Sequence, residues 1–386
     1  MRSFISEKSK ATPRSIIREF VGMSYKYDNV LSFGFGQPDF VTPSHILDAA
    51  KASIDRGETF YAPNTGILPL REAISESYRK RGLDYKINEI LVGAGAISVL
   101  NLAMTATLDI GDEVIISDPC YACYEGLCIQ MGCKPVRVRV YEENGFMYNV
   151  DDVRAAITDK TKLILLNSPS NPTGGVASKE NLEALAKLCV EKDIFCISDE
   201  IYRELLWCNE PYTSIASFPG MKERTILIDG FSKTYAMTGI RLGYAAGPED
   251  VIVKMTMLLE NVLSSVFTAS QWAGVAALTG SQDCVEEMLA LYRHRRKLML
   301  DGINSIDGIS CKDPKGAFYL FANIQSTGLD SRTFATKLLE AEKMLVIPGV
   351  GFGSGGEGFV RFCYATNDEQ IKDGIERLSR FMKTLK

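Results

Sequence analysis

Histidine is scarce in this chain of 386 residues, which contains only His45 and His294. Two histidines argue against hydrolysis that depends on a catalytic histidine and against a metal site built from several histidines. Runs rich in lysine and arginine are also missing, and the net charge is −5. Because a protein that binds nucleic acid usually carries a basic face, we predict no nucleic-acid partner.

Uninterrupted apolar runs of membrane-spanning length are missing as well. The uncharged run at residues 90–108 approaches that length, but glycines, hydroxyls and Asn101 interrupt it. A strand, a glycine turn and a buried helix account for this run better, so we predict no membrane segment. The first twenty or so residues lack the apolar core of a secretory signal and predict a short helix beginning near Pro13, with an organellar transit peptide as the alternative.

Cysteine, in contrast, is frequent: there are ten, four of them within residues 120–133. The spacing of Cys120 and Cys123 is compatible with zinc, an iron–sulfur cluster or a redox pair. However, a zinc ribbon needs a second such pair, and we expect Cys128 and Cys133 to lie on one helix. We therefore predict no metal site. Free thiols in this number indicate a reducing compartment, the cytoplasm.

Strand-like and helix-like segments alternate between about residues 88 and 260. This alternation predicts an α/β fold whose large domain has a mostly parallel seven-stranded sheet covered by helices on both faces. Ser178 is the expected N-cap of one of these helices. The seven expected strands are 89–93, 112–117, 134–140, 161–167, 194–200, 224–230 and 241–247.

The pattern changes after about residue 280. A long charged helix at 284–306 is followed by strand patterns at 316–324 and 358–366, with a helix near 331–343 between them and a final helix after them. This mixture predicts a smaller α+β domain. We expect residues 45–280 to form the large, cofactor-binding domain, and residues 1–44 to join 281–386 in the small one.

In an open α/β sheet, functional residues gather at the carboxyl ends of the strands. The run Gly95-Ala96 follows the first expected strand and precedes a helix, an arrangement that favours binding of a phosphate. It also resembles a dinucleotide fingerprint, although Ser98 stands where the third glycine belongs. A nicotinamide-dependent dehydrogenase is therefore one alternative.

Two further expected strands end near polar side chains. Asn171 lies in the turn sequence SNPTGG, which either is only a rigid turn or holds the amide at the strand tip. Asp199 ends an apolar strand, where a buried carboxylate needs a partner. It either caps the helix expected to follow or faces a cationic ring nitrogen.

Lys233 and Arg241 are the only charged residues in the stretch GFSKTYAMTGIRLG, residues 230–243. A desolvated lysine near another cation loses its preference for the charged form, and a neutral amine forms a Schiff base with an aldehyde. Arg241 and the Ser232 hydroxyl are suited to a phosphate dianion. The alternative is two surface cations beside a loop. Together with Asp199, these residues fit one ligand, pyridoxal phosphate, which carries an aldehyde, a phosphate and a ring nitrogen.

The chain resembles the class I/II aminotransferases of the fold type I pyridoxal-phosphate enzymes. Six motifs in the order and at the intervals of that family carry the resemblance. They are GQPDF (36–40), YAPNTGILPLREAI (61–74), SNPTGG (170–175), SDEIY (198–202), SKTYAMTGIRLGY (232–244) and FVRFCYAT (359–366).

The resemblance implies a role for each matching residue. Lys233 would bond to the cofactor and move a proton, Asp199 would keep the ring nitrogen protonated, and Arg361 would clamp the substrate α-carboxylate with help from Gly36. Asn171 and Tyr202 would bind the phenolic oxygen of the cofactor ring, and Asn171 would also contact the substrate. The remaining implied cofactor contacts are stacking by Tyr121 and phosphate binding by Gly95, Ala96, Ser232, Arg241 and, from a neighbouring subunit, Tyr61.

Arg361 also has a local argument, because it interrupts an apolar strand pattern with no acid beside it. Pairing with a distant acid is the alternative. Two positions depart from the family pattern. Gly230 stands where many relatives carry serine, which puts one phosphate contact in doubt. Ala96 stands where some aspartate-selective relatives carry lysine, which puts strict aspartate preference in doubt.

The resemblance predicts a homodimeric aminotransferase that moves an amino group from an L-amino acid to a 2-oxo acid, with 2-oxoglutarate the expected acceptor. The reaction would be of the ping-pong type through a Schiff base on pyridoxal phosphate, and the active sites would lie at the subunit interface. A cystathionine-type C–S β-lyase on the same fold is the nearest alternative. A regulator that only senses pyridoxal phosphate is another, but the segment before GQPDF is too short for a DNA-binding domain.

Overall fold

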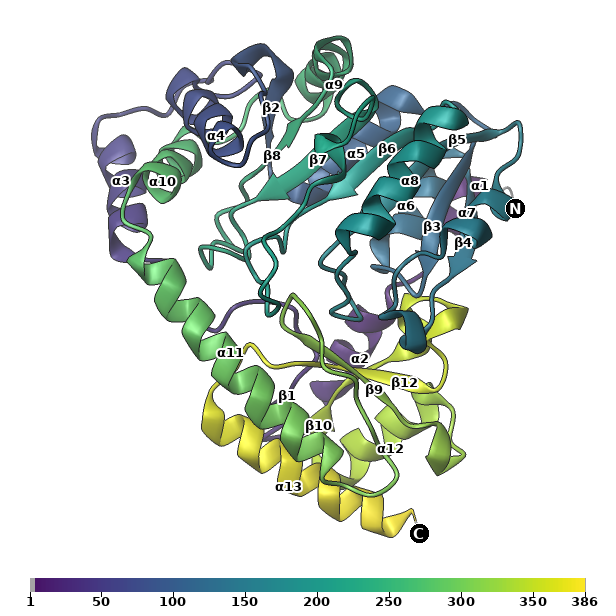
Figure 1. The fold of residues 1–386 in the computed structure, drawn as a ribbon. Coiled ribbons are helices and arrows are strands. Elements are labelled where there is room, and N and C mark those ends of the chain that lie inside the picture. The colour runs from purple at the N-terminus through teal and green to yellow at the C-terminus, as the bar shows by residue number, and fades with distance from the viewer. Residues whose placement is uncertain (1–3, 386) are drawn as a thin grey trace.

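A seven-stranded sheet forms the centre of the fold in the computed structural model, which describes residues 4–385 (Figure 1). Strand β8 runs antiparallel to both of its neighbours, β2 and β7, whereas the remaining pairs are parallel. The predicted mostly parallel seven-stranded sheet is therefore confirmed. Its order is β2 (Ile90–Gly93), β8 (Gly243–Ala246), β7 (Thr225–Gly230), β6 (Phe195–Asp199), β5 (Thr161–Asn167), β3 (Glu113–Asp118) and β4 (Lys134–Arg139).

Helices cover both faces of this sheet, because its strands are apolar on both faces. In β5, Leu163 and Leu165 pack toward one helical layer, while Ile164 and Leu166 pack toward the other. The first layer contains α5 (Ala96–Thr107), α6 (Cys123–Met131) and α9 (Glu249–Val262). The second contains α3 (Ser44–Asp55), α4 (Leu68–Lys80), α7 (Val150–Ala156), α8 (Lys179–Glu191) and α10 (Thr268–Thr279). Ser178 caps α8 as predicted, because its hydroxyl accepts a hydrogen bond from Asn181 N at 3.2 Å.

A second group of elements lies beside the sheet (Figure 1). Its three-stranded antiparallel sheet has the order β11 (Ile347–Pro348), β12 (Phe359–Cys363), β9 (Tyr319–Asn323), and β1 (Leu31–Ser32) pairs with β10 (Met344–Leu345). The long helix α11 (Asp283–Asn304) runs from the region of α10 and packs along α13 (Asp368–Thr384). The predicted C-terminal helices and strands are thus present, with α12 (Ser331–Glu342) between the strands.

The N-terminal segment contacts both groups of elements. Helix α1 (Glu7–Ala11) contacts α6, whereas α2 (Ile16–Ser24) packs on β10 and β11. The Ser15 hydroxyl caps α2, so this helix begins close to the predicted start at Pro13. The division of the chain into 45–280 and 1–44 with 281–386 stays a prediction.

The cysteine-rich segment differs from the sequence expectation at one residue. Helix α6 ends at Met131, and Gly132 follows with a left-handed φ of 78°. Cys133 is therefore not on the helix that carries Cys128, because the chain turns at Gly132 toward β4. All ten cysteines are free, and residues 4–385 contain no group of three or more side chains placed to hold a metal ion. No described helix is both long enough and apolar enough to cross a membrane.

Candidate functional site

A cavity of about 380 Å³ lies where the carboxyl ends of β5, β6 and β7 face the three-stranded sheet. Neighbouring strands of the large sheet end in register there, with Asn167 of β5 beside Asp199 of β6. All the predicted site residues line this cavity except Gly95 and Tyr61. Those that line it are Gly36, Ala96, Tyr121, Asn171, Asp199, Tyr202, Ser232, Lys233, Arg241 and Arg361.

Lys233 lies just beyond β7 and donates a hydrogen bond from Nζ to the backbone oxygen of Gly36 at 2.6 Å. It forms no ion pair with any described acid. Desolvation lowers the pKa of Lys233 to about 8, and the charges of Arg361 and Arg241 act in the same direction. A larger share of this amine is therefore neutral near pH 8 than for an ordinary lysine, and the neutral amine is the nucleophilic form.

Asp199 is buried, and two donors hold its carboxylate. Tyr124 Oη donates to Oδ2 at 2.8 Å, and the Ile201 N–H donates to Oδ1 at 3.2 Å. Burial raises the pKa of Asp199 to about 6, and these two hydrogen bonds limit the rise. The group is mostly ionised at neutral pH and would gain from a cationic partner in the cavity.

Arg361 on β12 is only 1% exposed, yet it pairs with no acid among residues 4–385. Its Nη1 donates to Asn171 Oδ1 at 2.8 Å, and its Nη2 donates to the Gly34 backbone oxygen at 2.6 Å. The guanidinium lies over the ring of Tyr319 at 4.5 Å, and its Nε has no hydrogen-bond partner among those residues. A buried arginine without a carboxylate is suited to receive one from a ligand.

The start of α5 forms an anion cradle opposite Arg241. Gly95 has a φ of 92°, and a Cβ on it would lie 2.6 Å from Arg241 Nη2, so glycine lets the backbone approach the guanidinium. Arg241 donates only to backbone oxygens, those of Thr238 at 2.9 Å and Ala94 at 3.4 Å. With Ser232 also in the lining, the chemistry of these donors fits a phosphate.

Two tyrosine pairs complete the polar lining. Tyr202 Oη and Tyr319 Oη lie 2.7 Å apart, and the ring of Tyr121 meets the ring of Tyr124 edge to face at 5.5 Å. Tyr61 lies outside the cavity, and 87% of its surface is exposed.

The departure at Gly230 has a packing reason. A Cβ at this buried position would lie 3.1 Å from Gly243 Cα and from the Leu242 backbone oxygen. Any larger residue there would crowd β8, the neighbouring strand. The Ala96 side chain lines the cavity and brings no charge to it.

Several residues of the site were missed from the sequence. Asn167 bridges two predicted residues, since its Nδ2 donates to the Asp199 backbone oxygen at 3.1 Å and its Oδ1 accepts from Asn171 N at 2.9 Å. Asn167 is the last residue of β5, so the expectation that functional residues gather at the carboxyl ends of strands would have found it. Tyr124 and Tyr319 carry no comparable signal, because their partners at the site, Asp199 and Tyr202, lie 75 and 117 positions away in sequence.

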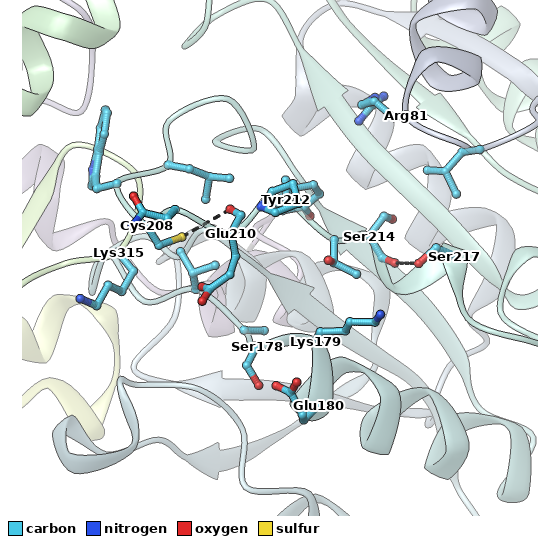
Figure 2. A pocket seen from close by; sticks show the side chains of 18 residues that line it. Arg81, Ser178, Lys179, Glu180, Cys208, Glu210, Tyr212, Ser214, Ser217 and Lys315 are labelled. Carbon is cyan, nitrogen blue, oxygen red and sulfur yellow. Dashed lines mark hydrogen bonds between the residues drawn. The ribbon is translucent and has the colours of Figure 1, made fainter.

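A second cavity, of about 930 Å³, lies at the start of α8 (Figure 2). Its lining contains both signs of charge, with Lys179 and Lys315 alongside Glu180 and Glu210, and Arg81 stands apart from them. None of the predicted site residues lines it. The smaller cavity is therefore the candidate site, because it alone gathers the predicted lysine, carboxylate and arginines.

Comparison with known proteins gives a match along almost the entire chain. A family model described as aminotransferase class I and II matches residues 28–378. An aspartate aminotransferase of Pyrococcus abyssi is 41% identical, and an aromatic-amino-acid aminotransferase of Thermococcus litoralis is 39% identical, each with 99% of both chains covered. The structure of an aspartate aminotransferase from Thermus thermophilus with maleate superimposes with a TM-score of 0.93 at 37% identity, over 99% of this chain and 100% of that one.

Proposed function

Because the chain belongs to the class I and II aminotransferases, we propose that it transfers an amino group from an L-amino acid to a 2-oxo acid in a ping-pong reaction, with pyridoxal phosphate as cofactor. The acceptor is 2-oxoglutarate in this proposal. The observation that carries it is the Lys233 amine, which faces the cavity without a carboxylate partner and has a pKa of about 8.

The family membership confirms the resemblance found in the sequence. The names of the relatives favour amino transfer over β-elimination, since those relatives are called aspartate and aromatic aminotransferases. The dehydrogenase alternative gives Lys233 and Asp199 no shared task.

The residues present fit the proposed cofactor. The Ala96 N–H, with Ser232 and Arg241, would hold its phosphate, and Asp199 would face its ring nitrogen. The Gly95 N–H already donates to the Gly93 backbone oxygen at 2.8 Å and would have to exchange that bond to join them. Asn171 and Tyr202 would reach its phenolic oxygen, and Tyr121 would stack on its ring. When bound, pyridoxal phosphate supplies an aldehyde that bonds to amines and a ring that accepts electrons.

The protein's own groups divide the remaining work. Arg361 binds the α-carboxylate of the substrate with two parallel hydrogen bonds, and the Gly36 backbone supports this contact. Lys233 would take the proton from the substrate Cα and return it at C4′, the former aldehyde carbon of the cofactor. Asp199, through its negative charge, would favour a protonated ring nitrogen on the bound cofactor.

The lowered pKa of Lys233 predicts a pH dependence for the cofactor-free protein. Since only the neutral amine attacks an aldehyde, the rate at which Lys233 captures added pyridoxal phosphate is expected to rise from about pH 7 and level off above about pH 9. For a lysine with the usual pKa of about 10.4, the capture rate would still be rising above pH 9. Stopped-flow absorbance measures the rate, with Lys233→Ala as the blank. A rise that continues to about pH 10.5 would contradict the lowered pKa.

We also propose a homodimer in which Tyr61 contacts the cofactor phosphate of the partner subunit. Phe60 and Tyr61 are adjacent aromatic side chains exposed at 86% and 87%, which is unusual unless a partner covers them. Sedimentation equilibrium should give twice the chain mass, and a monomer at micromolar concentration would rule this arrangement out.

We place the protein in the cytoplasm, a proposal supported by the ten free thiols, which a reducing compartment preserves. Fractionation of the source cells tests this placement.

The proposed function is tested with a panel of L-amino acids against 2-oxoglutarate and pyruvate. The purified protein should be yellow and should form the new amino acid without releasing ammonia. Production of pyruvate and ammonia from cystathionine, with no transfer to either acceptor, would point to a β-lyase.

A further inference from the structure

The lining of the candidate site holds more positive charge than the proposed function uses. Its cations are Lys233, Arg241, Arg361 and Arg18, and its only acid is Asp199. Three of these cations have tasks: covalent attachment, the cofactor phosphate and the substrate α-carboxylate. Arg18 is left without a task.

Arg18 is placed by the start of α2. The helix begins after Ser15, whose hydroxyl accepts a hydrogen bond from Arg18 N at 3.4 Å, and Ser15, Ile17 and Arg18 all line the cavity. This helix packs on β10 and β11, so Arg18 approaches from a different side than the start of α5.

The Arg18 side chain forms no ion pair or hydrogen bond with any other residue that the structure describes. The acid nearest in sequence, Glu19, is already held by Arg332 at 2.6 Å. Arg18 lies close enough to Cys123, at the start of α6, for its charge to oppose the rise that burial causes in the pKa of that thiol. The guanidinium therefore stands at the cavity with its donors free.

We propose that Arg18 binds the second carboxylate of a dicarboxylic substrate, such as glutamate, aspartate or 2-oxoglutarate, while Arg361 binds the first. The inference rests on the proposed function and deepens it by naming the substrate class. Arg18 would supply the positive charge that a lysine at the position of Ala96 brings in some aspartate-selective relatives.

The same cavity lining also suits substrates with apolar or aromatic side chains. Ile17, Phe35, Ile97 and Leu100 give the cavity an apolar part, and Arg18 is exposed enough to extend into solvent. Amino acids with aromatic side chains are then accepted without Arg18, whereas dicarboxylic ones depend on it.

The test replaces Arg18 by methionine, which keeps the flexible stem and removes the charge. Holoenzyme binding of maleate is measured by calorimetry, and kcat/KM is measured for glutamate and for phenylalanine. Loss of a charge-assisted contact at a partly exposed site should weaken maleate binding and lower kcat/KM for glutamate about tenfold. The value for phenylalanine should stay within about twofold of the wild type. Arg14→Met is the matched control, because it removes the same charge from the same segment and Arg14 is outside the cavity lining.

The outcomes separate this inference from the proposed function. Unchanged maleate binding in Arg18→Met, or an equal loss with glutamate and phenylalanine, overturns the role of Arg18. A wild-type protein that transfers the amino group of phenylalanine but does not bind maleate overturns it as well. Maleate binding that depends on Arg18 in a protein that transfers no amino group would support the carboxylate site and sink the proposed function.

Discussion

Replacing Lys233 by alanine is expected to reduce amino transfer at least about 10⁴-fold, because one side chain would supply two functions. In the proposed function, its amine would form the covalent bond to the cofactor and later move the proton at the substrate Cα. No other described amine lines the cavity to take over either function.

The measurement is the transient rate of amino transfer from glutamate, followed through the absorbance of the bound cofactor. Lys187→Ala serves as the control, since Lys187 is an exposed residue of α8 that pairs with Glu183. The Lys233 variant should keep its fold, because the Nζ makes a single hydrogen bond, to Gly36 O. A variant that turns over within about tenfold of the wild type would remove Lys233 from the mechanism.

The ends of the buried strands are the part of the site that a sequence predicts best. Asp199 and Lys233 follow apolar runs that must lie inside a parallel sheet, and in such a sheet the carboxyl ends meet at one edge. The sheet order and the cavity lining show this meeting directly. Local composition is sufficient here because the polar residue and the strand that positions it are neighbours in the chain.

Contacts between distant segments are not predictable in the same way. Gly34 accepts from Arg361 although 327 positions separate them, and the Tyr202–Tyr319 contact spans 117. The position of Arg18 at the cavity was unpredictable for the same reason, because it depends on how α2 packs on the distant strands β10 and β11. Backbone conformation limits local prediction too: Gly132 ends α6 before Cys133 through its left-handed φ.

The second large effect is expected for Arg361→Lys, which keeps the charge and removes the forked pair of donors. In the structure, Nη1 and Nη2 bind Asn171 and the Gly34 backbone, so the guanidinium is held in one orientation before substrate arrives. A lysine ammonium cannot present two parallel donors, and it has no plane to be held in one orientation. The free Nε of Arg361 also shows that the protein does not satisfy all its donors.

The expected loss in kcat/KM for the amino acid is at least about 30-fold, because truncating a buried, hydrogen-bonded charge pair costs about 2 kcal/mol or more. The loss should appear mainly as a higher KM, with cofactor affinity unchanged, since the proposed function has Arg361 binding the substrate and not the phosphate. Arg377→Lys is the control, a forked arginine that holds Asp373 on α13 and lies outside the cavity lining. If Arg361→Lys instead lowered cofactor affinity and left KM unchanged, the buried guanidinium would be supporting Asn171 and the sheet rather than receiving a carboxylate.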